Sequence, residues 1–366
     1  MRANQSSVTR EGAGSPGYLF IDNARFISML AIVMRHCELS LLGDSPAPPL
    51  ESAIVQFRTF GVQIFFVNSA FLMAGWLARP NSTSGAYWRN RLQRVAEPWF
   101  IWAAAYEIMA LTIYFLRGGA QLSEVPYRIW ANVFYQSYWF VPILFFSLAI
   151  LLPLRRYWQS WWFGLLLLAP SLIYGVNQYY RWFAPSHTVA FFGYLFPLWL
   201  GVQLFQRSQT VQAWIDRIPW WLIFTLLCVA FAFMIGEDRV MSSFGFPDTY
   251  NALQISNQLY SFVVLAALIK LPVRLVPAFI DVRKESYGIY LSHQIVASIG
   301  RGVIDLAAGL HRSSESFFER LPGLIHNPFA RIGLWFVWFG LIYTASLLIT
   351  KALRRTPLAW IVGANE

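Results

Sequence analysis

Apolar stretches that are long enough to cross a bilayer follow one another along nearly the whole chain. A membrane-spanning helix needs about 20 predominantly apolar residues, and about ten stretches of this sequence come close to that length. They cover residues 26–42, 57–78, 95–116, 130–152, 161–180, 188–205, 220–235, 252–271, 287–306 and 332–350. Inside a bilayer, only helices and closed barrels pair all of their backbone polar groups. Apolar runs of this length therefore restrict the chain to a bundle of membrane helices.

The charge of the chain agrees with this fold. Charged residues make up 13% and hydrophobic residues 57% of the 366 positions, whereas a soluble domain carries about 25% charged residues. The net charge of +10 would suit a nucleic acid, but the Lys and Arg residues gather in every second connection between the apolar stretches. These connections hold roughly twice as many basic residues as the others, which places both termini in the cytoplasm. The sequence predicts an all-α, polytopic membrane helical bundle, with the lipid bilayer and not a nucleic acid as its surroundings.

The predicted domain organisation is simple, because no long polar segment separates the apolar stretches. Residues 1–25 are polar, rich in Ser and Gly, and lack the apolar core of a signal peptide, so they are expected to form a short cytoplasmic tail. Residues 26–353 form the transmembrane domain and residues 354–366 a second cytoplasmic tail. Both cysteines, Cys37 and Cys228, fall in apolar stretches, and no close cluster of His, Cys and carboxylates has the spacing of metal ligands. The sequence therefore predicts neither a disulfide framework nor a metal site.

Arg25 and His36 are the first candidates for chemistry inside the membrane. They are eleven positions apart, so a helix places both on one stripe, separated by roughly 16 Å along its axis. Arg25 would lie at the cytoplasmic face and His36 near the bilayer centre, where an ionisable group usually marks a functional site. Histidine is the commonest side chain that takes a proton from a hydroxyl near neutral pH. The alternative is an imidazole that only bonds a neighbouring helix, but Arg35 and Glu38 beside it favour a water-accessible cavity.

Three arginines precede the third apolar stretch. Arg91 and Arg94 are three residues apart, which in a regular helix puts both guanidinium groups on one face, with Arg89 nearby. Each guanidinium group can bind phosphate oxygens in a bidentate manner. The alternative is that the arginines only anchor the helix to anionic lipid at the membrane boundary. Glu97, three residues beyond Arg94, is a candidate for a substrate contact unless it simply pairs with that arginine.

Five short motifs, taken in order, resemble those of the acyltransferase 3 family of integral membrane O-acyltransferases. They are IDNARFISMLAIVMRHCE with its Arg-x10-His pattern, FFVNSAFLMAGWL, YWRNRLQRVAEPWF, SYWFVPILF and YGIYLSHQIV. Residues 22–25 and the short length also resemble the glucan succinyltransferase-like subgroup. The sequence departs from the family pattern at Ala70, where glycine is usual, and at Arg35, where a small or apolar residue is usual.

The resemblance implies a ten-helix enzyme of the inner, cytoplasmic membrane. It would move an acyl group from cytoplasmic acyl-coenzyme A to a hydroxyl of an envelope carbohydrate or glycolipid. The expected group is acetyl, and succinyl is the second choice. Acyl-coenzyme A would be a co-substrate, with no permanently bound cofactor. His36 would act as general base. The alternative mechanism is that His36 itself takes the acyl group and forms an acyl-histidine intermediate. Arg25 would line the donor channel or fix the first helix, and Arg89, Arg91 and Arg94 would hold the coenzyme A phosphates.

Later stretches add candidates for contacts with the acceptor. Trp139 would stack on a sugar or, alternatively, pack and anchor its helix. His293, with Tyr290 one turn before it, would orient the acceptor or stabilise an oxyanion, unless it only bonds within the bundle. The competing functional class is a polytopic transporter or flippase for a glycolipid or small solute. Transporters often contain two repeated halves, and this sequence shows no such repeat.

Overall fold

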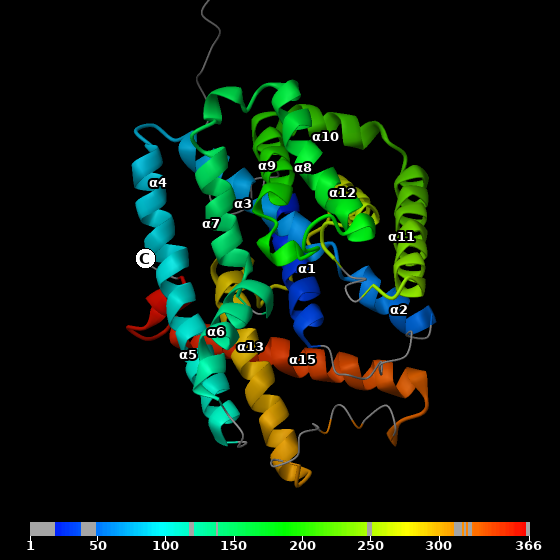
Figure 1. Ribbon diagram of the computed structural model, residues 1–366. Coiled ribbons are helices and arrows are strands. Elements are labelled where there is room, and N and C mark those ends of the chain that lie inside the picture. The colour runs from blue at the N-terminus through cyan, green and yellow to red at the C-terminus, as the bar shows by residue number, and fades with distance from the viewer. Residues whose placement is uncertain are drawn as a thin grey trace, which may run out of the picture.

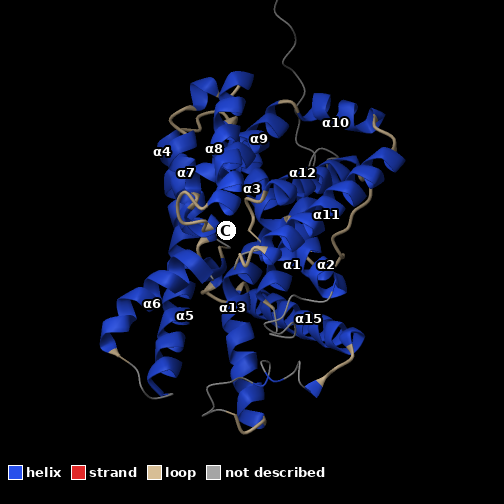
Figure 2. Cartoon of the chain, turned by 45° about the vertical axis from the view of Figure 1, so that its right-hand side comes forward, coloured by secondary structure: helices blue, strands red, loops and turns tan. Residues whose placement is uncertain are grey.

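Helices connected by short loops make up the described part of the chain. The computed structural model describes residues 19–37, 49–116, 121–136, 138–246, 251–310, 317, 320 and 324–363. Within these ranges the secondary structure is entirely helical (Figures 1 and 2). The helices are α1 (Leu19–His36), α2 (Pro49–Phe57), α3 (Gly61–Leu77), α4 (Ser84–Arg91), α5 (Glu97–Leu116), α6 (Val125–Ala131), α7 (Phe140–Leu151), α8 (Trp161–Tyr180), α9 (Leu195–Gln206), α10 (Ser208–Arg217), α11 (Trp220–Ser243), α12 (Ile255–Lys270), α13 (Val282–Ala307) and α15 (Pro328–Leu353).

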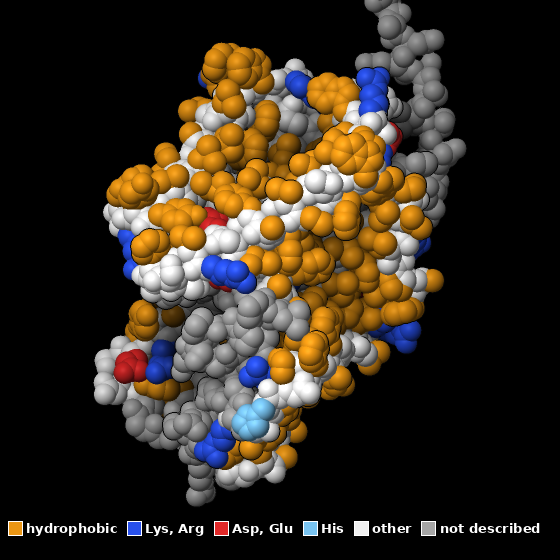
Figure 3. All heavy atoms as spheres, turned by 90° about the vertical axis from the view of Figure 1, so that its right-hand side faces the viewer, with side chains coloured by type: hydrophobic (Ala, Val, Ile, Leu, Met, Phe, Trp, Pro, Cys, Tyr) orange, Lys and Arg blue, Asp and Glu red, His pale blue; other side chains and the backbone are white. Residues whose placement is uncertain are grey.

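Among the described residues, four helices are long and apolar enough to cross a membrane. They are Ala53–Leu77, Ser84–Leu116, Trp220–Ser243 and Pro328–Leu353, and the bent pair Leu122–Tyr135 and Phe140–Leu151 counts as a fifth if it forms one span. Hydrophobic side chains cover much of the face shown in Figure 3, as expected of a surface that meets lipid. The predicted all-α, polytopic membrane fold is confirmed. The prediction of about ten spans is not, because α9 and α12 have only 12 and 16 residues and α1 contains Asp22, Arg25 and Arg35.

The first helix differs from its predicted bounds. α1 begins at Leu19, seven residues before the predicted stretch, and His36 is its last residue. The polar residue Asp22 fits in the helix because its carboxylate accepts hydrogen bonds from Arg283 of α13, with an Nη2–Oδ2 distance of 2.9 Å. Glu38, which follows His36 in the sequence, lies outside the described residues. Arg25 and His36 nevertheless belong to one continuous helix, as predicted.

α1 is the central helix of the bundle (Figure 1). One of its faces buries Met29 and Val33 against Leu291 of α13. The opposite face buries Ala24 and Ala31 in a cluster with α3 and α12. α3 in turn packs closely on α9, because a Cβ atom at Gly201 would lie only 2.1 Å from the backbone oxygen of Val67. Helices α3, α12 and α13 thus pack around α1.

Candidate active site

A cavity of about 290 Å³ lies at the end of α1. Its polar and aromatic lining comes from five separate parts of the chain and includes Arg35 and His36 of α1, Arg58 before α3, Tyr135 and Trp139 before α7, His187 in the loop after α8, and Tyr290 of α13. Three of the residues singled out from the sequence, His36, Trp139 and Tyr290, therefore line one cavity. A concave space with a few converging polar groups is the usual form of a small-molecule site.

A second histidine stands directly beside His36. The ring centroids of His36 and His293 are 5.1 Å apart. His293 is fully buried, and its Nδ1 lies 2.6 Å from the carbonyl oxygen of Tyr290. A carbonyl can only accept a hydrogen bond, so we assign the proton of the neutral ring to Nδ1. Nε2 then keeps its lone pair, and among the described residues it has no hydrogen-bond partner.

The hydroxyl of Tyr290 is a second buried polar group at the cavity. Tyr290 is 5% exposed, lines the cavity, and its hydroxyl has no hydrogen-bond partner within the described ranges. Leaving a buried polar group unpaired costs about 1–3 kcal/mol, so such groups mark places where a ligand or water binds. The Tyr290 hydroxyl and His293 Nε2 are therefore available to a polar ligand next to His36.

A row of rings on α13 connects this cavity with the arginine-rich segment between α4 and α5. Tyr287 and Tyr290 are nearly parallel, with centroids 6.1 Å apart, and the Tyr290 and His293 centroids are 5.9 Å apart. At the far end of the row, the Tyr287 hydroxyl donates a hydrogen bond of 2.6 Å to the carbonyl oxygen of Val95. The row thus runs from Val95, one residue after Arg94, to the histidine pair.

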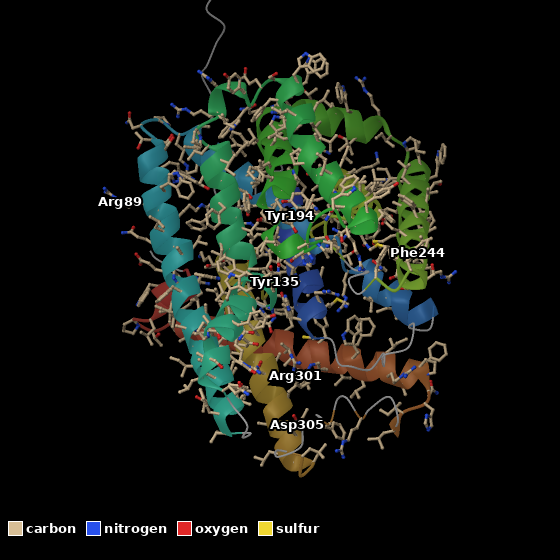
Figure 4. All side chains as sticks on the ribbon, viewed as in Figure 1. Arg89, Tyr135, Tyr194, Phe244, Arg301 and Asp305 are labelled. Atoms are coloured by element: carbon tan, nitrogen blue, oxygen red, sulfur yellow. The ribbon has the colours of Figure 1, made fainter. Side chains whose placement is uncertain are left out.

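The three arginines of that segment differ in their exposure and contacts. The helix is α-helical up to Arg91 and then π-helical from Leu92 to Ala96, and the wider π turn changes the spacing on which the prediction depended. Arg91 is half-buried, and its Nε donates to the Tyr87 hydroxyl at 3.1 Å. Arg94 is exposed. Arg89 is also exposed, and Figure 4 shows it pointing outward from the bundle.

Arg91 is instead grouped with Arg25. Arg25 is partly buried, and it lies close enough to Asp22, Arg91 and Arg283 for their charges to interact. The structure therefore brings together the two arginines from α1 and α4 at one end of the bundle. Glu97 is exposed, and no ion pair joins it to Arg94 in the described part of the chain.

Trp139 lies in the interior, not at a lipid-facing position. It is 6% exposed and meets the His187 ring edge-on, with centroids 5.2 Å apart. Its other face approaches Tyr194, at a centroid distance of 5.9 Å. The indole therefore forms a wall of the cavity together with a histidine to which the sequence assigned no role.

Arg58 is a further lining residue that the sequence did not reveal. It is 2% exposed, and its Nη1 donates a 2.6 Å hydrogen bond to the carbonyl oxygen of Met34, while Nε donates to Val55. A cation at the C-terminal end of a helix satisfies its last carbonyl groups and its dipole. Arg58 thereby fixes the last turn of α1, which carries His36.

Buried side-chain amides hold the loop that forms another wall of the cavity. Gln63 of α3 donates to the carbonyl oxygen of the lining residue Ala252 at 2.8 Å. Asn257 and Gln258 of α12 donate to the carbonyl oxygens of Asn251 and Leu253 at 3.1 and 2.8 Å. Non-helical backbone is tolerated at membrane depth where protein groups pair with it. The amide network thus allows a loop to reach the site.

A comparison with protein-family models identifies the family of the chain that carries this site. The model of the acyltransferase 3 family, described as an acyltransferase domain, matches residues 18–355, a range that holds every residue of the cavity. The chain belongs to the acyltransferase 3 family. It is therefore a multi-pass membrane enzyme that transfers acyl groups, as the resemblance of the five motifs predicted. The comparisons with curated proteins and with solved structures give no match.

Proposed function

We propose that this acyltransferase works in the inner, cytoplasmic membrane, with ten spans and both termini in the cytoplasm. It would transfer an acetyl group, or as second choice a succinyl group, from cytoplasmic acyl-coenzyme A to a hydroxyl of an envelope carbohydrate or glycolipid. The observation that supports this best is the row of rings from Val95 through Tyr287 and Tyr290 to His293 and His36. It joins a basic end of the bundle to a cavity that holds a histidine pair.

The donor would enter at the end of the bundle where Arg25 and Arg91 meet. Guanidinium groups bind phosphates strongly and in a defined orientation, and coenzyme A carries several phosphates. Eleven residues of α1 separate Arg25 from His36, or roughly 16 Å. The pantetheine arm is a thin chain long enough to cover that distance, along the Tyr287–Tyr290 face of α13. The thioester would then lie in the cavity beside His36.

His36 would act as the general base of a direct transfer. The acceptor oxygen attacks the thioester carbonyl while its proton passes to the imidazole of His36. The bond between carbonyl carbon and sulfur then breaks, and the proton on His36 passes to the departing thiolate. The products are an ester on the acceptor and free coenzyme A. The Tyr290 hydroxyl would donate to the oxyanion, His293 Nε2 would orient the acceptor by accepting from a second, non-reacting hydroxyl of it, and Trp139 would pack against the sugar.

Arg91→Ala is expected to raise the KM for acetyl-coenzyme A about 10- to 150-fold, because a charge-assisted hydrogen bond to phosphate contributes about 1.5–3 kcal/mol. The KM for the acceptor should stay near the wild-type value. Arg91→Lys should restore only part of the affinity, since lysine offers a point charge. Arg89→Ala is the matched control, because this arginine is exposed and points away from the bundle.

The assay uses purified protein in nanodiscs, labelled acetyl- or succinyl-coenzyme A, and the envelope glycan fraction of cells that lack the gene. The proposed function requires the label to appear on glycan, identified by mass spectrometry. Hydrolysis of acyl-coenzyme A without any acylated glycan would contradict the assigned acceptor. Equal KM values for acetyl-coenzyme A in the Arg91→Ala and Arg89→Ala proteins would place the phosphate site elsewhere.

A further inference from the structure

A second cavity, of about 530 Å³, lies between the last turns of α5 and the short helix α6. Its lining includes Tyr114 of α5 and Glu124, Tyr127, Arg128 and Asn132 in and around α6. We propose that this cavity, called the α5–α6 groove below, binds the carbohydrate portion of the acceptor and guides it along α6 to His36. This inference deepens the proposed function and rests on it.

The groove has a fixed polar wall. Glu124 Oε2 accepts a hydrogen bond from the Tyr114 hydroxyl at 2.7 Å and another from Arg128 Nη2 at 3.0 Å. The Arg128 guanidinium also lies 3.7 Å from the centre of the Tyr114 ring. These three side chains hold each other in place, so a ligand meets donors and acceptors whose orientation is already set. Hydroxyl-rich ligands gain affinity from such preorganised groups.

A buried carboxylate that contacts a lining residue of the groove also points to a ligand. Glu107 is on the same face of α5 as the lining residues Ala110, Leu111 and Tyr114, at spacings of three, four and seven residues. It is 8% exposed, and its Oε2 accepts a 3.0 Å hydrogen bond from the lining residue Asn132. Its Oε1 is buried without a hydrogen-bond partner among the described residues. A buried polar atom of this kind in a membrane helix marks a functional site.

Aromatic rings lead from the groove to the cavity at His36. Tyr127 lines the groove, and its ring centroid is 6.3 Å from that of Trp130. Trp130 lies 4.6 Å from Tyr135, which lines the His36 cavity and which Figure 4 places near the middle of the molecule. Tyr127 and Trp130 are 68% and 45% exposed. Flat rings of this kind suit the apolar faces of successive sugar residues, while the Glu124–Arg128 pair suits their hydroxyls.

The location of the groove favours a carbohydrate that arrives from outside the cell. Arg89 and Tyr114 lie near the two ends of the continuous helix Ser84–Leu116, which is long enough to cross the bilayer. The groove is thus on the membrane face opposite to the arginines of the donor end. A lipid chain would gain nothing from an ion pair between Glu124 and Arg128, whose side chains are 44% and 43% exposed.

The test compares Tyr127→Ala, Trp130→Ala and Glu107→Gln with a control, Trp162→Ala, which removes from α8 an aromatic ring about as exposed as that of Tyr127. We expect the three groove variants to need about 10-fold more glycan for half-maximal transfer, the usual effect of losing one anchor of a binding site. Their KM for acetyl-coenzyme A should not change, and the control should behave like the wild type. Unchanged half-saturation by glycan in the groove variants would overturn the proposal.

A binding measurement without acyl transfer tests this inference independently of the proposed function. The same glycan fraction is titrated onto protein in nanodiscs without acyl-coenzyme A. Weaker binding by the groove variants than by Trp162→Ala supports the groove even if the wild type transfers no acyl group, in which case the proposed function alone fails. If a lipid extract without sugars displaces the glycan equally well, the groove is a lipid site and the inference is wrong.

Discussion

His36→Ala is expected to lower the rate of acyl transfer by about 100- to 10,000-fold, the usual contribution of a general base. His36 ends α1 at the wall of the cavity, and the His293 ring lies 5.1 Å from it. The measurement is single-turnover transfer of labelled acetyl from acetyl-coenzyme A to the glycan fraction, with the dissociation constant of coenzyme A determined in parallel.

The matched control is His326→Ala, an exposed histidine outside the cavity and shortly before α15. It should transfer at the wild-type rate. The His36→Ala protein should still insert, accumulate and bind coenzyme A, because Arg25 and Arg91 are unchanged. Wild-type turnover by His36→Ala would remove the general-base assignment, whereas lost coenzyme A binding would show that the substitution damages the donor end of the site.

Tyr290→Phe is expected to lower kcat by about 100- to 1,000-fold, the effect of removing one donor from an oxyanion site. The ring contacts with Tyr287, Phe140 and His293 would remain. Only the hydroxyl is lost, and in the described structure this buried group has no hydrogen-bond partner. Its removal should therefore leave the melting temperature unchanged or higher, since an unpaired buried hydroxyl destabilises a fold by about 1–3 kcal/mol.

Tyr138→Phe provides the contrast to Tyr290→Phe. The Tyr138 hydroxyl donates a 3.0 Å hydrogen bond to the carbonyl oxygen of Leu291, so its loss should lower the melting temperature with little effect on kcat. A Tyr290→Phe protein that melts earlier but turns over normally would show that the hydroxyl has a structural role. Normal kcat and an unchanged melting temperature would remove Tyr290 from the mechanism.

The helices could be predicted wherever apolar residues alone decide the structure. The predicted stretch 161–180 has the same bounds as α8, and each of the other nine stretches overlaps at least one helix. The start of α1 could not be predicted, because Asp22 depends on Arg283, which is 261 positions away. The fourth stretch is broken by a bend of 65° between Leu122–Tyr135 and Phe140–Leu151, and no proline or glycine lies between these two helices to indicate it.

The site could be predicted only in part, for a related reason. His36, Trp139 and Tyr290 were identified one by one from depth, residue type and motif resemblance, and the fold then placed all three at one cavity. Neither Arg58, at the start of the second predicted stretch, nor His187, just before the sixth, stood out in the sequence, because their places at the cavity result from tertiary contacts with Met34 and Trp139. The π-helical turn at Leu92–Ala96, next to a half-buried Arg91 and with an exposed Arg94 inside it, also has no sequence signal.

The most direct test of the account concerns the side from which the donor enters. α10 and the start of α4 lie at the same end of the bundle (Figure 1). A cysteine introduced at Ser208, the first residue of α10, therefore reports the side of Arg91 through its reaction with an impermeant maleimide. The unsubstituted protein, with Cys37 and Cys228, is the control for this labelling.

Labelled acetyl-coenzyme A, which does not cross membranes, is then added to sealed inner-membrane vesicles of both orientations. The account predicts acylated glycan only in inverted vesicles, in which the cytoplasmic face is outside, and labelling of the Ser208→Cys protein in the same vesicles alone. Acylation in right-side-out vesicles, or maleimide labelling there, would contradict a cytoplasmic donor path from Arg25 and Arg91 to His36.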